Sequence, residues 1–160
     1  MKQTIVAAAL FGVFATTAQA VDMNTDALKR MQQEGHKIAD EAKTGKPIKA
    51  NNGNCLATQG KPGTNGANLV TQKCNNKAKQ HRWSFDGQGR LVNDGGLCVE
   101  VAGNKAGGAA KMSNCKGNAQ QKWAMDGQKR LKGRNNLCLQ VNGNKVITAD
   151  CAGGGNQKWR

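Results

Sequence analysis

Beyond residue 45, the chain consists of short apolar runs that alternate with turn-forming residues. The breaks are Asn-Gly, Asp-Gly and Gly-Gly pairs. This spacing predicts many short strands joined by tight turns, and therefore an all-β fold. Asp86-Gly87 and Asp126-Gly127 are each expected to form a hairpin turn, because Asp and Gly tolerate a positive φ. Pro47 lacks a backbone N–H and predicts an edge position for the first strand.

Residues 21–45 have a different pattern, with apolar residues at helical spacing and no Cys or Trp. The pattern predicts an amphipathic helix over about 25–43, started by Asn24 or Thr25 and ended by Gly45. Such a helix either lies on the domain surface or forms a loosely attached tail. The alternative is a helix that binds a partner or another copy of the chain. The apolar positions are Leu28, Met31, Ile38 and Ala42.

Residues 1–20 have the composition of a secretory signal peptide. Lys2 is followed by an apolar run over 5–15, and Ala18-Gln19-Ala20 matches a small-residue cleavage site. The run is too short for a transmembrane helix, and no later segment is apolar enough to be one. We therefore expect cleavage near Ala20 and a secreted protein, either periplasmic or extracellular.

Five anchor residues recur three times in the same order, which indicates a threefold internal repeat. In each copy an aliphatic or Thr position follows the first Cys by three residues, and a Trp follows the second Cys by eight or nine. The expected repeats cover about 46–88, 89–128 and 129–160, after a helical extension over 21–45. The anchors are Ile48, Cys55, Thr58, Cys74 and Trp83; Leu91, Cys98, Val101, Cys115 and Trp123; and Leu131, Cys138, Val141, Cys151 and Trp159.

The third copy ends one residue after its Trp, whereas the first two continue with Phe85 and Met125 two residues after theirs. If these two side chains shared the face of the Trp, the third copy would leave a gap in the core. The 25–43 helix is the segment available to cover such a gap. We therefore expect a very short last strand.

Six Cys in a secreted chain predict three disulfides, for which number alone allows fifteen connectivities. Because each repeat holds one pair, we expect Cys55–Cys74, Cys98–Cys115 and Cys138–Cys151. Clustered Cys and His spacing of the kind that binds zinc is absent from the sequence, so no metal is expected. Each disulfide closes a loop that contributes roughly 3 kcal/mol by loop-closure entropy, which supports a domain with few large aliphatic residues.

Three copies of about forty residues with paired Cys and a Gln-x-Trp ending resemble the ricin B-chain lectin family. Gln121-Lys122-Trp123 and Gln157-Lys158-Trp159 match the family's QxW signature, and His81-Arg82-Trp83 departs from it by one residue. The resemblance covers about 46–160. It implies a β-trefoil of twelve strands. The signature residues are expected in its core: Trp83, Trp123, Trp159, Gln121 and Gln157.

The resemblance also implies one shallow sugar pocket per repeat. The family places an Asp two residues after the first Cys, an aromatic residue two before the second Cys, and a polar residue before the QxW Gln. The corresponding residues here are Ala57, Gln72 and Gln80; Glu100, Ser113 and Gln120; and Gln140, Ala149 and Asn156. Every stacking aromatic is missing. The candidate carbohydrate-binding residues are Glu100, Ser113, Gln120, Gln140 and Asn156, and Glu100 with Gln120 is the first choice.

The chain has a formal net charge of +14. Such a charge creates a field that attracts polyanions. Acidic glycans, lipopolysaccharide, cell-wall polymers and nucleic acid all carry the required charge, although no motif for specific nucleic-acid recognition is present. The densest basic run is the candidate polyanion-binding site: Lys129, Arg130, Lys132 and Arg134.

These features predict a secreted, lectin-like carbohydrate-binding module that favours acidic glycans through a basic surface. The alternatives are a non-lectin structural or polyanion-binding trefoil and the binding subunit of a toxin. An enzyme is not expected, because His36 and His81 have no nucleophile pattern nearby and the carboxylates are scattered. No cofactor is expected.

Overall fold

The computed structural model describes residues 25–160, with the backbone alone described over 38–43. The chain divides between Ile38 and Ala39 into two units, each described by itself. The first contains most of helix α1, which spans Thr25–Lys43 and confirms the predicted helix. Every helix side chain described, from 25 to 37, is exposed, including Leu28 and Met31. Among the described helices, none is long and apolar enough to cross a membrane.

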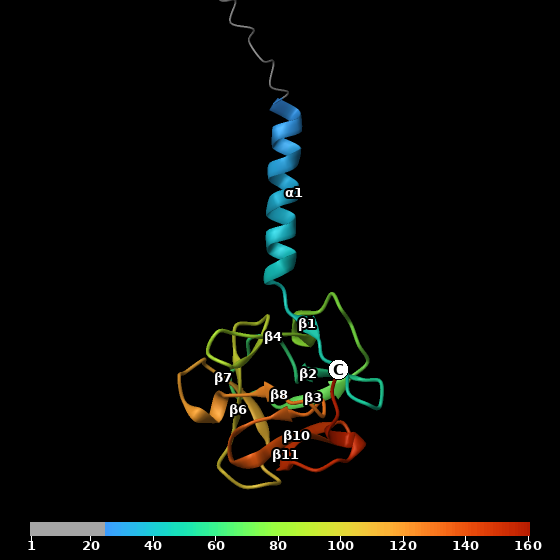
Figure 1. Cartoon of the computed structure of the whole chain (residues 1–160), viewed down its shortest axis with the longest axis vertical. Helices are drawn as coiled ribbons and strands as arrows, with labels where there is room; N and C mark the ends of the chain where they lie inside the picture. The colour runs from blue at the N-terminus through green and yellow to red at the C-terminus, as the bar shows by residue number, and fades with distance from the viewer. Residues whose placement is uncertain (1–24) are drawn as a thin grey trace, which may run out of the picture. The chain divides into compact units, whose positions relative to one another are not determined.

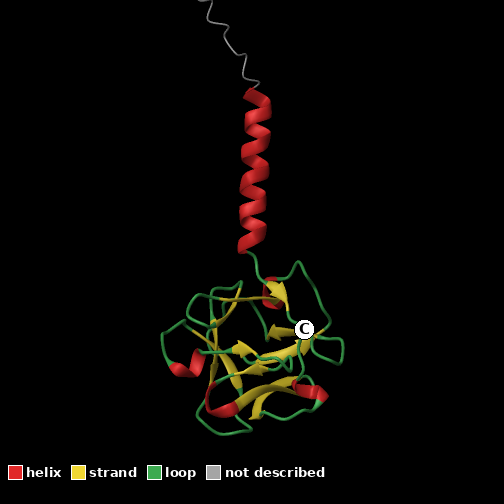
Figure 2. Cartoon of the chain, viewed as in Figure 1, coloured by secondary structure: helices red, strands yellow, loops and turns green. Residues whose placement is uncertain are grey.

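The second unit is a β-trefoil, as the repeat and its resemblance predicted (Figures 1 and 2). The strands are β1 Lys46–Pro47, β2 Cys55–Thr58, β3 Leu69–Gln72, β4 Arg82–Phe85, β5 Leu91–Asn93, β6 Cys98–Val101, β7 Ala110–Ser113, β8 Ala124–Met125, β9 Leu131–Lys132, β10 Leu137–Asn142 and β11 Lys145–Asp150. One sheet has the order β1-β4-β5-β6-β7 and the other β2-β3-β11-β10-β9-β8.

Each repeat contributes one hairpin that begins at its first Cys or, in the third repeat, one residue before it. These hairpins are β2–β3, β6–β7 and β10–β11, and all three are antiparallel. A 3-10 turn containing the QxW Gln or its His equivalent then leads into the strand or bridge around the Trp. The three turns are η1 Lys79–His81, η2 Ala119–Gln121 and η4 Gly155–Gln157.

The three Trp side chains are buried, with at most 3% exposed. Each indole N–H donates to the carbonyl of the residue that follows the first Cys of its own repeat, at 2.9, 3.0 and 3.1 Å. This bond satisfies the polar end of a ring whose remaining surface is packed in the core. The acceptors are Leu56, Val99 and Leu139, whose own side chains are fully buried.

Three disulfides hold the repeats, and each joins the two Cys of one repeat. They are Cys55–Cys74, Cys98–Cys115 and Cys138–Cys151, with Cα–Cα separations of 4.9, 5.0 and 5.0 Å. In each repeat the bond ties the start of the Cys hairpin to the loop that precedes the Trp, so the loop residues are held close to the QxW position.

Hairpin turns join the repeats at both predicted positions, between β4 and β5 and between β8 and β9, but the positive φ does not fall on the Asp-Gly pair. The first turn spans Asp86 to Arg90, and the Asp86 N–H donates to the Arg90 carbonyl at 3.1 Å. The positive φ lies at Gly89, 72°, and at its equivalent Lys129, 62°. The longer loop matches the three- to five-residue hairpin class, in which one residue near the end adopts the left-handed conformation.

The predicted gap in the third repeat does not exist. Phe85 and Met125 are 42% and 39% exposed, so these positions do not fill the core and a missing equivalent leaves no hole. The barrel is closed instead by backbone bonds between Lys49 and Arg160, at 2.6 and 2.8 Å, and by a bridge between Ala50 and Trp159. The last strand is reduced to this bridge and a second one between Arg130 and Lys158, which agrees with the expected very short strand.

Candidate functional site

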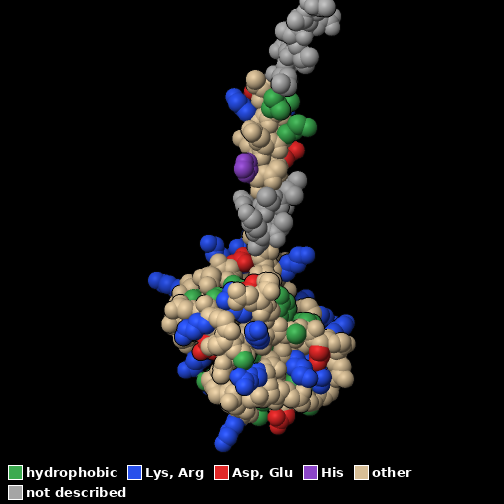
Figure 3. Space-filling view, turned by 60° about the vertical axis from the view of Figure 1, so that its left-hand side comes forward, with side chains coloured by type: hydrophobic (Ala, Val, Ile, Leu, Met, Phe, Trp, Pro, Cys, Tyr) green, Lys and Arg blue, Asp and Glu red, His purple; other side chains and the backbone are tan. Residues whose placement is uncertain are grey.

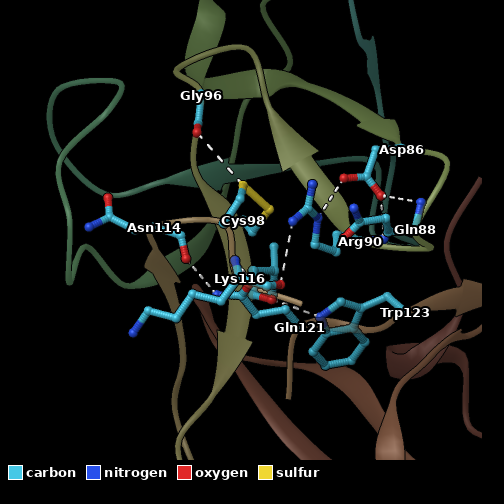
Figure 4. Close-up of polar contacts among 11 residues, drawn as sticks. Asp86, Gln88, Arg90, Gly96, Cys98, Asn114, Lys116, Gln121 and Trp123 are labelled. Carbon is cyan, nitrogen blue, oxygen red and sulfur yellow. Dashed lines mark hydrogen bonds and ion pairs between the residues drawn. A yellow bond between two sulfur atoms is a disulfide. The ribbon is translucent and has the colours of Figure 1, made fainter. Parts of the chain in front are cut away.

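Gln121 organises the candidate pocket of the second repeat (Figure 4). Its Oε1 accepts the backbone N–H of Lys116 at 2.6 Å. Its Nε2 donates to the Asn114 carbonyl at 2.8 Å and to Glu100 Oε2 at 2.7 Å. The side chain is fully buried. The QxW Gln therefore fixes both the loop around Cys115 and one oxygen of the candidate sugar-binding carboxylate.

The third repeat uses the same arrangement. Gln157 Oε1 accepts the Ala152 N–H at 2.8 Å, and its Nε2 donates to the Asp150 carbonyl at 2.8 Å and to Gln140 Oε1 at 2.9 Å. Gln140 stands where the second repeat has Glu100. Because an amide oxygen carries no charge, this pocket has no carboxylate for a ligand hydroxyl.

In the first repeat, His81 takes the place of the Gln. Its Nδ1 accepts the Asn75 N–H at 2.8 Å, and its Nε2 lies 3.3 Å from Gln72 Oε1. The residue two after the first Cys is Ala57, which is fully buried and has no polar group for a ligand. The first repeat therefore keeps the structural network and lacks the sugar-binding group.

The residues predicted for carbohydrate binding fall into two places. Glu100 on β6, Ser113 at the end of β7 and Gln120 in η2 are all half-buried and belong to the second repeat. Asn156 is exposed and lines a depression of about 280 Å³ together with Asn51, Asn52 and Val141. Asn51 and Asn52 come from the first repeat. Sequence comparison of the repeats gives no signal for them, because the neighbourhood forms only when the barrel closes.

Arg130 is not a free cation, contrary to its place in the predicted polyanion site. It forms an ion pair with Asp126 at 2.8 Å, and its Nη1 donates to the Ala152 carbonyl at 3.3 Å. Arg90 and Asp86 form the same pair in the previous repeat, at 2.6 Å (Figure 4). The Asp-Gly-Gln-x-Arg segments are thus structural turns that bind one repeat to the next.

Hydrogen bonds in these turns lower the pKa of both carboxyls. For Asp126, bonds from the Arg130 backbone and side chain have this effect. For Asp86, burial alone would raise the pKa, but hydrogen bonds from Arg90 and Gln88 outweigh it. Both carboxylates stay charged and paired, which removes them and their Arg partners from the groups available to a ligand.

The rest of the predicted basic run is divided between two depressions. Lys129 lines one of about 360 Å³, together with Lys158 and Trp159. Lys132 and Arg134 line another of about 380 Å³, together with Lys122 and Trp123. The four residues therefore do not form one patch, and sequence proximity alone did not reveal Lys122 as a neighbour of Arg134.

The trefoil carries most of the basic charge. Residues 46–160 hold 19 of the 24 Lys and Arg and 5 of the 10 Asp and Glu. Figure 3 shows Lys and Arg side chains spread over one face of this unit with few acidic ones between them. No group of three or more His, Cys, Asp or Glu that could hold a metal ion occurs among the described residues.

Solved structures with a similar fold include one designed protein and two natural ones. A designed threefold-symmetric protein, ThreeFoil, is 24% identical with a TM-score of 0.65, over 72% of this chain and 95% of its own. The Vibrio vulnificus hemolysin/cytolysin β-trefoil lectin, solved with N-acetyl-D-lactosamine bound, is 21% identical with a TM-score of 0.62, over 74% and 93%. The agglutinin from Abrus precatorius is 17% identical with a TM-score of 0.67, over 73% and 47%.

These identities are low enough that the likeness shows the fold alone. No curated protein matches the chain by sequence. The profile of the ricin-type β-trefoil lectin domain, however, matches residues 43–159, which is most of the chain. The chain therefore belongs to the ricin-type β-trefoil lectin domain family, a family of carbohydrate-binding modules.

Proposed function

We propose that this chain is a secreted carbohydrate-binding module whose preferred ligands are acidic glycans. The observation that carries the proposal is the excess of basic side chains on the trefoil that have no acidic partner. Within residues 46–160, three of the five acidic side chains are paired with Arg82, Arg90 and Arg130. The other basic side chains of this unit lack an ion pair, so their charge is available to an anionic ligand.

The candidate pockets are poorly suited to binding neutral sugars. The positions where the family stacks an aromatic ring on the sugar hold Gln72, Ser113 and Ala149. Without stacking, a neutral sugar is held by a few hydrogen bonds that compete with water, each contributing about 1 kcal/mol. Charge attraction from the surrounding Lys and Arg is therefore the larger source of affinity for this surface.

Secretion is supported by the disulfides and by the predicted signal peptide. Three disulfides in one small domain are typical of proteins that fold in an oxidising compartment. The signal peptide predicted over 1–20 lies outside the residues that the structure describes. Periplasmic and extracellular locations both agree with these features.

A second candidate function is an ordinary lectin with one pocket for a neutral sugar, in the second repeat. The specific observation is that Gln121 holds only Oε2 of Glu100, which leaves Oε1 for a ligand hydroxyl. Such binding would depend on the Glu100 carboxylate and would be independent of net charge.

The two functions are distinguished by paired glycans that differ only in acidic groups. We expect the protein to bind a sulfated or uronic-acid oligosaccharide and to bind its neutral counterpart far more weakly. Replacement of Glu100 by Ala should leave this binding unchanged or improve it, because a negative charge is removed. Equal binding of the neutral counterpart, abolished in Glu100→Ala, would contradict the proposal. Binding of lipopolysaccharide or nucleic acid in preference to every acidic glycan would also contradict it.

A further inference from the structure

The trefoil has three equivalent junctions, here called seams. At each seam, the residue before a Trp lies close to a residue of the neighbouring repeat, four positions before the first Cys of that repeat. The third repeat meets the first in this way. In the first seam, the Asp94 N–H donates to the Arg82 carbonyl at 3.1 Å. In the third seam, the Asn51 N–H donates to the Lys158 carbonyl at 3.2 Å. Among the described residues, Arg134 and Lys122 of the second seam do not form this bond. A different backbone bond is common to all three seams: the N–H groups of Asn93, Gly133 and Ala50 donate to the carbonyls of Leu97, Leu137 and Asn54 at 2.9, 2.8 and 2.7 Å. The side chains at the three seams can therefore be compared by their position in the repeat.

The first seam neutralises its own charge. Arg82 Nε lies 2.5 Å from Asp94 Oδ2, and Asp94 Oδ1 accepts the Gly45 N–H at 2.9 Å. Asn93 fills the space beside this pair, since its Nδ2 donates to the carbonyls of Arg82 and Lys79 at 3.0 Å each. No ligand is needed at this seam.

The second seam has the opposite character. Lys122 occupies the place of Arg82, and Arg134 occupies the place of Asp94, so a cation faces the position where the first seam has a carboxylate. Lys132 lies beside them, and all three line the depression of about 380 Å³. No acidic residue lines it. Within residues 46–160, none of the three cations has an ion-pair partner.

The second seam also differs from the first in the residue beside the Trp. Gly133 stands where the first seam has Asn93, and it lies directly against the Trp123 ring. A Cβ added at Gly133 would approach the ring carbons to 2.9 Å. The side chain that fills the first seam is therefore absent, and the floor of the depression is the edge of Trp123 with Gly89, Ala119 and Ala124 around it. The volume lies within the range of small-ligand sites.

We propose that the second seam binds the sulfate or carboxylate group of an acidic sugar residue, which supplies the anion that Asp94 supplies in the first seam. This inference rests on the proposed function and locates it. An Arg guanidinium can bind such a group through two parallel hydrogen bonds, and the two Lys ammonium groups add charge-assisted bonds. The site is separate from the candidate sugar pocket at Glu100.

The test replaces Arg134 by Asp, which recreates the acidic residue of the first seam and pairs it with Lys122. Lys145→Asp is the matched control, because it changes the net charge equally and Lys145 lines a different depression. Binding of a sulfated and of a carboxylate-only tetrasaccharide is measured by calorimetry at about 50 mM salt. We expect Arg134→Asp to weaken binding about tenfold or more and Lys145→Asp to weaken it about threefold or less.

Arg134→Gln and Lys122→Gln should give intermediate losses, and they serve as further tests if the Asp variant does not fold. Equal losses in Arg134→Asp and Lys145→Asp would overturn the seam site and leave the proposed function standing. A wild-type protein that binds neither tetrasaccharide would contradict both. A response to one tetrasaccharide alone identifies whether sulfate or carboxylate is the group that the seam binds.

Discussion

His81 accepts a hydrogen bond at Nδ1 from the backbone N–H of Asn75, 2.8 Å away, and so reproduces the role that Gln side chains have in the other two repeats. Since Nδ1 must accept, the proton of the neutral ring is on Nε2, which faces Gln72 Oε1 at 3.3 Å. The ring is buried, with 3% exposed, and burial lowers the pKa of His81.

The stability of the trefoil should therefore fall as the pH drops below the ordinary His value of 6.5. In this range the unfolded chain takes up a proton that the folded ring does not, so the free energy of unfolding decreases with decreasing pH. Above that pH the contribution is fully present. Urea unfolding between about pH 7.5 and 5 measures the effect, and His81→Gln should flatten the dependence.

His36→Gln is the matched control for this measurement, because His36 is exposed on α1. It should leave the pH dependence of trefoil unfolding unchanged. If His36→Gln flattened the curve as much as His81→Gln did, the role assigned to the Asn75–His81 bond would be wrong.

Lys129 adopts a left-handed backbone conformation that its equivalent, Gly89, adopts without a side chain. Such a conformation costs a residue with a Cβ about 1 kcal/mol. Lys129→Gly should therefore stabilise the domain by about that amount in urea unfolding. Gly89→Ala should destabilise the domain by a similar amount, because Ala would have to adopt the same left-handed conformation. An added Cβ would clash with nothing, since its nearest neighbour is the Trp123 carbonyl at 3.9 Å, so the backbone conformation is the only cost. Changes of the same sign in the two variants would contradict this account.

Thr58 is 2% exposed, and its hydroxyl has no hydrogen-bond partner among the described residues. The equivalent residues in the other repeats are Val101 and Val141. Thr58→Val should stabilise the fold by about 1–2 kcal/mol, because an unpaired buried hydroxyl is removed at nearly constant volume. Thr148→Val is the control: its hydroxyl bonds the Gly108 carbonyl at 3.1 Å, so the same change should destabilise. Destabilisation by both would disprove the assignment.

Trp123 combines core packing with the bond from its indole N–H to the Val99 carbonyl at 3.0 Å. Trp123→Ala should lower the free energy of unfolding by about 3–5 kcal/mol, as expected for a large aromatic removed from a packed core. Chemical denaturation gives the value. Little change in stability together with loss of glycan binding would instead make Trp123 a ligand platform.

Repetition within the sequence accounts for how much of the fold could be predicted. The phased Cys and Trp predicted a threefold repeat, and the resemblance of that repeat to the ricin B-chain lectin family implied the trefoil. The turns were harder, because the side chain of Asp86 bonds the backbone of Gln88 and Arg90, and this network is not visible in an Asp-Gly pair. The exposure of Phe85 and Met125 could not be predicted either, because it depends on where the strands end.

The candidate sites were less predictable for a different reason. Asp126 and Asp94 neutralise the charges of Arg130 and Arg82 through ion pairs. A count of charges in the sequence cannot distinguish these paired Arg from unpaired ones. The neighbourhood of Lys122 and Arg134 joins two repeats, so it appears only once the strands are paired. An alignment of the repeats does place Arg134 at the position of Asp94, and this difference in charge could have indicated that the two seams differ.

In the function proposed here, charge attraction supplies most of the affinity for glycans. The direct measurement is the dissociation constant of a sulfated oligosaccharide from about 50 to 200 mM salt, with a neutral oligosaccharide of the same length beside it. If several Lys and Arg displace counterions from the sulfated ligand, its affinity should fall by about 100-fold or more over this range. The neutral ligand should bind weakly at every salt concentration. Tight binding of the neutral ligand that is indifferent to salt would contradict the account.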